Sequence, residues 1–103
     1  MINLKNTIQD AVQAIEQTTT LFYQQKNSEG YQQLNQTLNS LMQAVDVIIT
    51  AKVNGNHINI DEQKLNAVLG RAMTAIENED TILLSDILVF ELKCMLEDCY
   101  YRL

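Results

Sequence analysis

Apolar residues recur at three- and four-residue steps through four segments of the chain, which is the period of an amphipathic helix. The predicted helices span about residues 3–26, 29–52, 61–78 and 80–103. The sequence contains no proline and three glycines, so the residues that most often interrupt helices are scarce. Short connections between long helices favour antiparallel neighbours. The pattern therefore predicts an all-α fold, a four-helix up-down-up-down antiparallel bundle that residues 1–103 form as a single domain.

The last segment is the most apolar part of the sequence and is expected to lie at the centre of the bundle. Asp80 precedes it as a candidate N-cap. Helical spacing then relates one stripe of residues: Leu84, Ile87, Leu88, Glu91, Leu92, Met95, Leu96 and Cys99. Glu91 is the charged member of this stripe. Either Glu91 lies at the edge of the apolar arc with its carboxylate in water, or Arg71 or Lys64 binds it, because an unpaired buried carboxylate is costly.

The first two helices are predicted to form a hairpin at the sequence Asn27-Ser28-Glu29-Gly30. Asn27 or Gly30 can adopt the left-handed backbone conformation, and Ser28 can cap the second helix. One continuous, kinked helix is the alternative. Within the first helix, Thr18 either bonds back to a carbonyl of its own helix or faces a partner helix.

The pair Asn54-Gly55 ends the second predicted helix. It either caps that helix or opens a small β-hairpin, and we favour the cap because a lone two-stranded ribbon is marginally stable. Ile60 and Leu65 have the spacing of a hydrophobic staple at the start of the third helix, and Asn59 with Glu62 has that of a capping box.

The third predicted helix is shorter than the other three, and this difference affects the surface of the bundle. Ala67 and Gly70 on this helix are small and are expected to allow close approach of a neighbour. A short third helix leaves part of the first two helices uncovered at one end. The sequence therefore predicts either an exposed apolar groove or a self-association surface.

The charge of the chain narrows the classes of partner. Seven basic and 13 acidic residues give a formal net charge of −6, and residues 57–103 carry −5 of it. Nucleic acids and anionic membranes are bound mainly through Lys and Arg, so neither is expected as a partner. Nothing at the N-terminus resembles a signal peptide, and no segment is long and apolar enough to span a membrane. Cys94 and Cys99 are poorly placed to pair on one helix, which indicates reduced thiols and a cytoplasmic location.

No constellation of catalytic or metal-binding residues stands out in the sequence. A glycine-rich phosphate loop, a nucleophile elbow and a His-Glu pair on a helix are missing, and His57 is the single histidine. We therefore expect no enzymatic activity, no cofactor and no metal. Four residues of the last segment, one charged and three aromatic, are the candidate contacts with a partner: Phe90, Glu91, Tyr100 and Tyr101.

Residues 84–97, Leu-Ser-Asp-Ile-Leu-Val-Phe-Glu-Leu-Lys-Cys-Met-Leu-Glu, resemble the closing motif of a small helical family of Firmicutes without an assigned function. That motif has the form Leu-x-Asp-x-Leu-x-Tyr-Glu-Leu, and Asp86, Leu88, Phe90, Glu91 and Leu92 match it in kind. The family's later proline and tryptophan are replaced here by Cys94 and Cys99. Its members tend to be associated with flagellar gene regions. The helix layout is also loosely similar to that of the flagellin export chaperones, and the resemblance carries over no site residues.

These observations predict a cytosolic bacterial protein-interaction module that is not an enzyme and that acts through a protein partner or as a homodimer. The alternative is a flagellum-linked export or assembly chaperone that binds an amphipathic helix of a client. A metal-dependent or small-molecule enzyme would require carboxylates that converge on a polar pocket.

Overall fold

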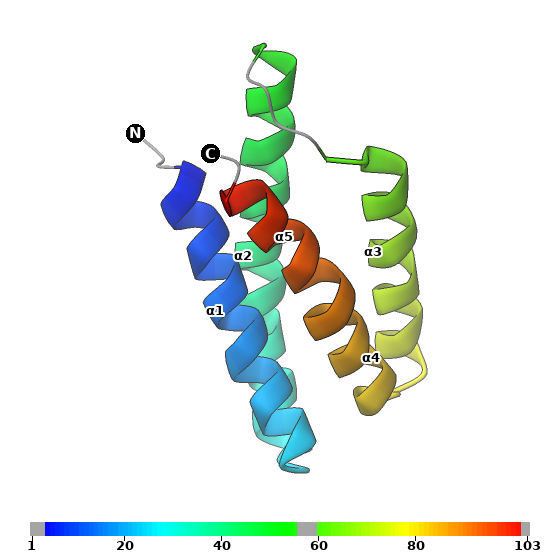
Figure 1. Cartoon of the computed structure of the whole chain (residues 1–103). Helices are drawn as coiled ribbons and strands as arrows, with labels where there is room; N and C mark the ends of the chain where they lie inside the picture. Colours follow the sequence, from blue (N-terminus) through cyan, green and yellow to red (C-terminus); the bar gives the residue numbers. More distant parts are fainter. Residues whose placement is uncertain (1–3, 56–59, 102–103) are drawn as a thin grey trace.

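A computed structural model describes residues 4–55 and 60–101, which form four helices and contain no strand. The helices run up, down, up and down, so the predicted all-α four-helix bundle is confirmed (Figure 1). The fourth helix, which we call the closing helix, is continuous over residues 81–101 and has a π-helical turn in its middle. The elements are α1 (Leu4–Tyr23), α2 (Asn27–Val53), α3 (Glu62–Glu77), α4 (Thr81–Ile87), the π-helical η1 (Leu88–Leu92) and α5 (Lys93–Tyr101).

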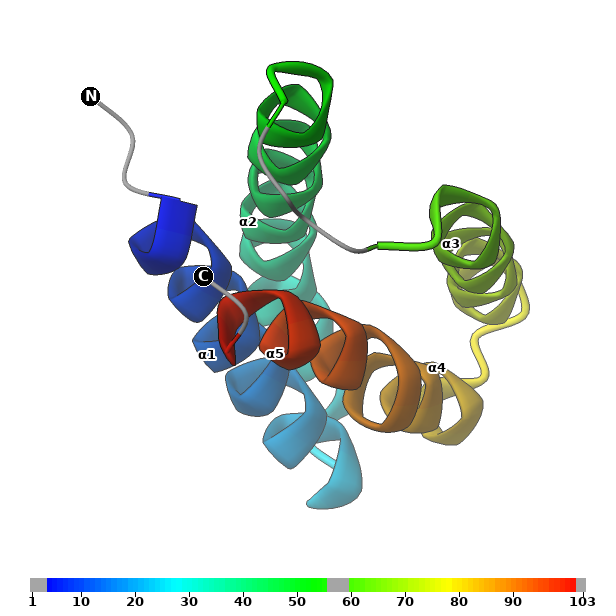
Figure 2. The ribbon, with the colours of Figure 1, turned by 45° about the horizontal axis from the view of Figure 1, so that its top comes forward.

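The closing helix lies between α1 and α3 and contacts both of them, whereas α2 packs along α1 (Figures 1 and 2). Its predicted stripe is confirmed as the centre of the core. Four leucines spaced four residues apart are at most 1% exposed: Leu84, Leu88, Leu92 and Leu96. Burial of each such side chain contributes about 1.5–3 kcal/mol. The other three helices supply the rest of the core, which includes Ile8 and Ile15 of α1, Leu41 and Ile48 of α2, and Leu65 and Val68 of α3.

The α1–α2 hairpin is confirmed, but the residues that make its turn differ from those predicted. Gln25 adopts the left-handed conformation (φ 63°), and α2 already begins at Asn27. Gly30 lies in the first turn of α2, where a Cβ atom would be 2.6 Å from the ring of Phe22. The glycine therefore allows α1 to approach α2 closely and does not form the turn. Beside it, Thr18 Oγ1 donates a 2.7 Å hydrogen bond to the Gly30 carbonyl, so Thr18 faces the partner helix.

Aspartate side chains cap the two helices that follow. The Lys64 amide donates to Asp61 Oδ1 (3.1 Å), and the Leu83 amide donates to Asp80 Oδ1 (3.0 Å), which confirms Asp80 as an N-cap. Asp61 is the N-cap of α3, so Glu62 is the first residue of that helix. A capping box with Asn59 as the N-cap would require Glu62 to be the third residue of the helix. Asn59, the other half of the predicted capping box, lies outside the described residues.

The end of α2 is linked to the start of α3 by Lys52. Its Nζ atom donates to the Ile60 carbonyl (3.2 Å) and lies 3.5 Å from a carboxylate oxygen of Glu62. Asn54 follows α2 as its C-cap, and Gly55 has φ +91°, as expected of a helix end. Residues 56–59 lie outside the described residues. The second strand of the alternative hairpin would fall there, and His57 is one of these residues.

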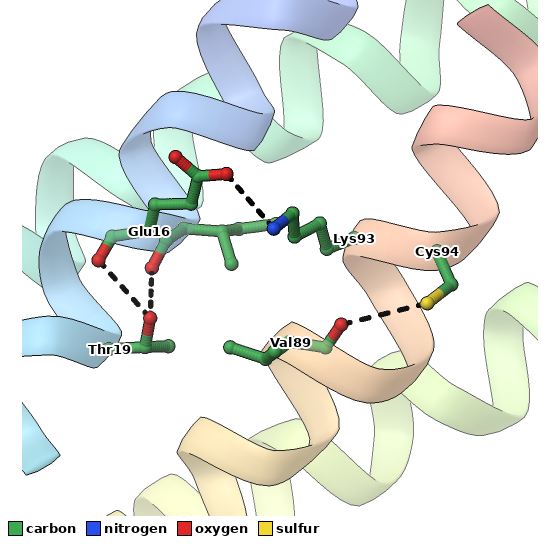
Figure 3. A network of polar contacts seen from close by, with 6 residues as sticks. Glu16, Thr19, Val89, Lys93 and Cys94 are labelled. Carbon is green, nitrogen blue, oxygen red and sulfur yellow. Dashed lines mark hydrogen bonds and ion pairs between the residues drawn. The ribbon is translucent and has the colours of Figure 1, made fainter. Parts of the chain in front are cut away.

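The π-helical turn at Leu88–Leu92 was not expected from the sequence. Within it the amide of Lys93 donates to the carbonyl five residues earlier, at Leu88. A π-turn contains one more residue than an α-turn, so it rotates α5 about the helix axis relative to α4. Figure 3 shows the associated contact of Cys94, whose Sγ lies 3.8 Å from the Val89 carbonyl oxygen.

Candidate protein-binding groove between α2 and α3

The arrangement of the four helices separates α2 from α3. The closing helix contacts α3 on one side and α1 on the other, and α2 packs mainly on α1 (Figure 2). Leu65, Val68, Ala72 and Ala75 are the buried residues of α3. As a result, the surface between α2 and α3 is hollowed along the middle of α2. The sequence predicted either an apolar groove or a self-association surface over one end of α1 and α2. The hollow lies instead along the middle of α2, so the predicted place was wrong.

The first cavity at this surface has a volume of about 340 Å³ and is lined by apolar or small residues throughout. Leu84 and Leu88 of the closing helix contribute to its lining together with residues of the two flanking helices. Those residues are Leu38, Leu41 and Met42 of α2 and Leu69, Gly70, Ala72 and Met73 of α3.

A second cavity of about 710 Å³ shares Met42 and Leu69 with the first. Its other lining residues mix apolar and polar side chains: Asn39, Gln43, Val45, Asp46 and Ile49 of α2 and Asn66 of α3. Because the two cavities share these lining residues and lie between the same two helices, we treat them as one feature, the α2–α3 groove. It has two helical walls, an apolar floor and a polar margin.

Two methionines are the most exposed apolar residues of the groove. Met42 is 56% exposed and Met73 is 50% exposed, whereas Leu41, Leu84 and Leu88 of the same lining are at most 1% exposed. A methionine side chain is flexible and polarisable and adapts to partners of different shape. In the sequence both methionines fall within the apolar stripes of their helices, directly after Leu41 and Ala72. Their positions at the edges of those stripes are the signal that could have revealed them.

Gly70 does not bring a neighbouring helix close, in contrast to the prediction. A Cβ atom added at Gly70 would have no atom within 4 Å, and Ala67 is exposed. The reason is that both residues lie outside the face of α3 that packs on the closing helix. Gly70 instead leaves part of the groove open.

The margin of the groove is acidic. Asp46 is the charged residue of the lining, and no basic residue lines either cavity. At the start of α3, Glu62 is paired with Lys52. Arg71 lies on α3 but binds Glu91 of the closing helix, outside the groove lining.

The four residues predicted to contact a partner lie on the closing helix and line neither cavity of the groove. Phe90 is 68% exposed and Tyr101 is 78% exposed. The Tyr100 ring packs edge-on against Tyr101, with ring centroids 5.4 Å apart, and lies 5.5 Å from Lys5 Nζ. The structure therefore does not bring these residues together with the groove.

Glu91 combines the two alternatives considered for it. Its carboxylate accepts a hydrogen bond from Arg71, as the second alternative stated, and its side chain is 31% exposed, so it also reaches water. The ion pair joins α3 to the π-helical turn.

Two polar contacts join the closing helix to α1. Lys93 Nζ is 3.0 Å from Glu16 (Figure 3), and this hydrogen bond raises the pKa of Lys93 against the opposing effect of burial. Tyr23 donates a 2.7 Å hydrogen bond to Asp86, and burial together with this bond raises the pKa of Tyr23 to about 12. These contacts fix the floor of the groove relative to the α1–α2 hairpin.

The described residues contain no group of three or more His, Cys, Asp or Glu side chains that could hold a metal ion. In the same part of the chain no helix is long and apolar enough to cross a membrane. Cys94 is exposed and Cys99 is buried, and no disulfide joins them in the described part of the chain. The groove offers apolar contact and one negatively charged side chain, Asp46, at its margin.

The model of the family described as "Domain of unknown function (DUF8042)" matches residues 1–100. No curated protein and no solved structure matches the chain.

Proposed function

The chain belongs to the DUF8042 family, and we propose that it is a protein-interaction module that is not an enzyme and that binds a segment of another protein in the α2–α3 groove. The observation that supports this proposal is the apolar lining of the groove, with Met42 and Met73 half exposed. An open apolar hollow with a few polar groups at its edge is the usual form of a binding pocket, and the groove has this composition.

The energetics of the groove agree with a binding role. Contact with a partner would remove the exposed parts of both methionines from water, at about 25 cal/mol for each Å² of apolar surface. The floor residues Leu84 and Leu88 are already buried, so the groove requires little reorganisation of the core. A groove that is formed before binding loses less conformational entropy when the partner binds.

Site-specific photo-crosslinking in the native host tests the proposal. A benzophenone amino acid is placed at position 73 in the groove or, as a matched control, at position 82 on the closing helix. Met73 and Ile82 are exposed to similar extents, 50% and 53%. We expect position 73 to form an adduct with a second protein and position 82 to form none with that protein. The captured protein is then purified and titrated against the unmodified chain.

Groove variants decide whether the captured protein is a true ligand. Met42→Lys should weaken its binding at least tenfold, and Ile82→Lys, which adds the same charge at an exposed apolar residue outside the groove, should leave it unchanged. Equal binding by Met42→Lys and the unmodified chain would contradict the proposal, and so would adducts that form equally well from position 82.

A flagellum-linked export or assembly chaperone is the second candidate function. The motif resemblance of residues 84–97 supports it, and so does an open apolar groove, which a chaperone needs in order to cover an apolar part of its client. The identity of the crosslinked protein distinguishes the two candidates. A secreted or flagellar client that binds before its own assembly supports the chaperone, whereas a permanent cytoplasmic partner supports the general interaction module.

A cytoplasmic location is part of the proposal. Neither Cys94 nor Cys99 is in a disulfide in the described part of the chain, which is compatible with a reducing compartment, where disulfides are rare. Fractionation of the host followed by immunodetection of the chain tests this point directly.

A further inference from the structure

We propose that the ligand of the α2–α3 groove is an amphipathic α-helix of another protein, with an apolar ridge that enters the groove and with Lys and Arg on its flanks. This inference rests on the proposed function and adds the conformation and the charge of the ligand. Three features of the groove support it: its helical walls, its length and its acidic margin.

The walls of the groove favour a helical ligand over an extended one. Both walls and the floor are helices, whose backbone groups are bonded within each helix, and the described residues include no strand edge. An extended peptide would place its own N–H and C=O groups against Leu38, Leu69 and the other apolar lining residues without hydrogen-bond partners. A helix satisfies its backbone internally and presents side chains alone.

The dimensions of the groove set the length of the ligand. The lining residues of α2 extend from Leu38 to Ile49. Eleven helical steps of 1.5 Å correspond to about 16 Å, or three turns. A ligand helix with apolar residues at positions i, i+3 or i+4, and i+7 would cover this distance with one ridge. The flexible side chains of Met42 and Met73 can adjust to the sizes of these residues.

The margin of the groove determines the preferred charge of the ligand. Asp46 lines the groove, and Glu77 is four residues after Met73 and so lies on the same side of α3. The nearby cations, Lys52 and Arg71, are paired with Glu62 and Glu91. A ligand with basic flanks meets uncompensated carboxylates, whereas one with acidic flanks meets like charge.

The same charges disfavour a second copy of the chain as the occupant. Each copy has a formal net charge of −6, so an acidic surface would have to dock on an acidic margin. Ile82, Leu83 and Phe90 are the exposed apolar residues of the closing helix between Thr81 and Leu92 that could serve as a ridge. Asp86 lies in the same part of the helix and adds a negative charge. If the closing helix of one copy docked in the groove of the next copy, each added copy would still offer a free groove or a free closing helix, so the contact would extend into an open chain of copies.

Fluorescence anisotropy with designed peptides tests the inference on the full chain. The first probe is an 18-residue helix with leucines at i, i+3, i+4 and i+7 spacing and with Lys and Arg on the flanks. The second has the same ridge with Glu on the flanks. The third has the composition of the first but alternates apolar and basic residues, so that it favours an extended strand. We expect the first probe to bind at least tenfold more tightly than either of the others and to weaken severalfold between 50 and 500 mM salt.

Matched variants connect this binding to the groove. Met42→Lys and Asp46→Asn should weaken the first probe at least tenfold and about threefold, respectively. Ile82→Lys and Asp10→Asn make the same chemical changes at exposed residues outside the groove and should have no effect. Thermal melts monitored by circular dichroism establish that every variant is folded.

The results of these experiments can contradict the inference without contradicting the proposed function. Preference for the acidic or the alternating probe, or failure of all three probes to bind, would contradict the helical, basic ligand while the crosslink at position 73 still tests the groove. Formation of dimers through the groove, detected by sedimentation and abolished by Met42→Lys, would identify a second copy as the occupant and would also overturn the inference.

Discussion

At the scale of single residues, Asp80 acts within its own helix, whereas Gly30 acts on the packing of one helix against another. The capping role of Asp80 was predictable because its partner is the amide three residues later. The role of Gly30 was not, because the requirement for a glycine there comes from the ring of Phe22 on α1.

Two glycines give opposite predictions for the same substitution. Gly30→Ala should destabilise the fold by about 1–3 kcal/mol, because its Cβ would overlap the ring of Phe22, which is 1% exposed. Gly70→Ala should stabilise it by about 0.5–1 kcal/mol, because the added Cβ has open space and alanine favours a helix. Urea unfolding of both variants measures the two effects. A stabilising Gly30→Ala would contradict the close packing of α1 on α2.

Tyr23 gives the chain a dependence on alkaline pH. Burial and the hydrogen bond to Asp86 raise its pKa from 10.0 to about 12. Between these values the unfolded chain loses the phenol proton while the folded chain keeps it, so the free energy of unfolding falls as pH rises through this window. Titration at 295 nm should show one late tyrosine, and Asp86→Asn should bring its pKa back toward 10. A late tyrosine that persists in Asp86→Asn would assign the shift to burial alone.

At the scale of elements, the four helices were predictable because amphipathic period is a local property of the sequence. The π-helical turn at Leu88–Leu92 was not, because apolar residues in this region fit both an α-turn and a π-turn. The position of α3 was also beyond the sequence. The apolar stripe of α3 shows which of its residues are buried. It does not show which helix covers them, and in the structure that helix is the closing helix rather than α2.

The central place of the closing helix predicts a large effect of Leu88→Ala. Leu88 is fully buried in the π-helical turn and also lines the groove, so its truncation should cost about 2–5 kcal/mol. Ile82→Ala, at an exposed residue of the same helix, is the control and should change stability by less than about 1 kcal/mol. Denaturant unfolding measures both. A loss below half a kcal/mol at Leu88 would remove this helix from the centre of the core.

The ion pair between α3 and the closing helix should contribute little to stability. Glu91 and Arg71 are both partly exposed, so Glu91→Gln should cost at most about 1 kcal/mol and less at high salt. A double-mutant cycle with Arg71→Gln isolates the interaction energy. A coupling energy of several kcal/mol that is insensitive to salt would show that the pair is shielded from water.

At the scale of the whole molecule, the sequence indicated that an apolar surface would remain open, and the structure locates it. The prediction followed from unequal helix lengths, whereas the groove results from the way α3 leans on the closing helix and away from α2. The candidate contacts at Phe90, Glu91, Tyr100 and Tyr101 came from local composition, which contains no information about where two helices separate. Met42 and Met73 belong to different helices, and the fold alone places them in one groove.

Methyl NMR of the chain labelled at its methionines, with the basic amphipathic probe peptide added, tests directly whether the α2–α3 groove is the binding site. Met42 and Met73 line the groove, and Met95 of α5, which lines neither of its cavities, is an internal control. If the peptide binds in the groove, the methyl signals of Met42 and Met73 should shift until they saturate, and the chemical shift of the Met95 methyl signal should not change. Binding that shifts Met95 and leaves the other two unchanged would contradict the assignment of the groove as the binding site.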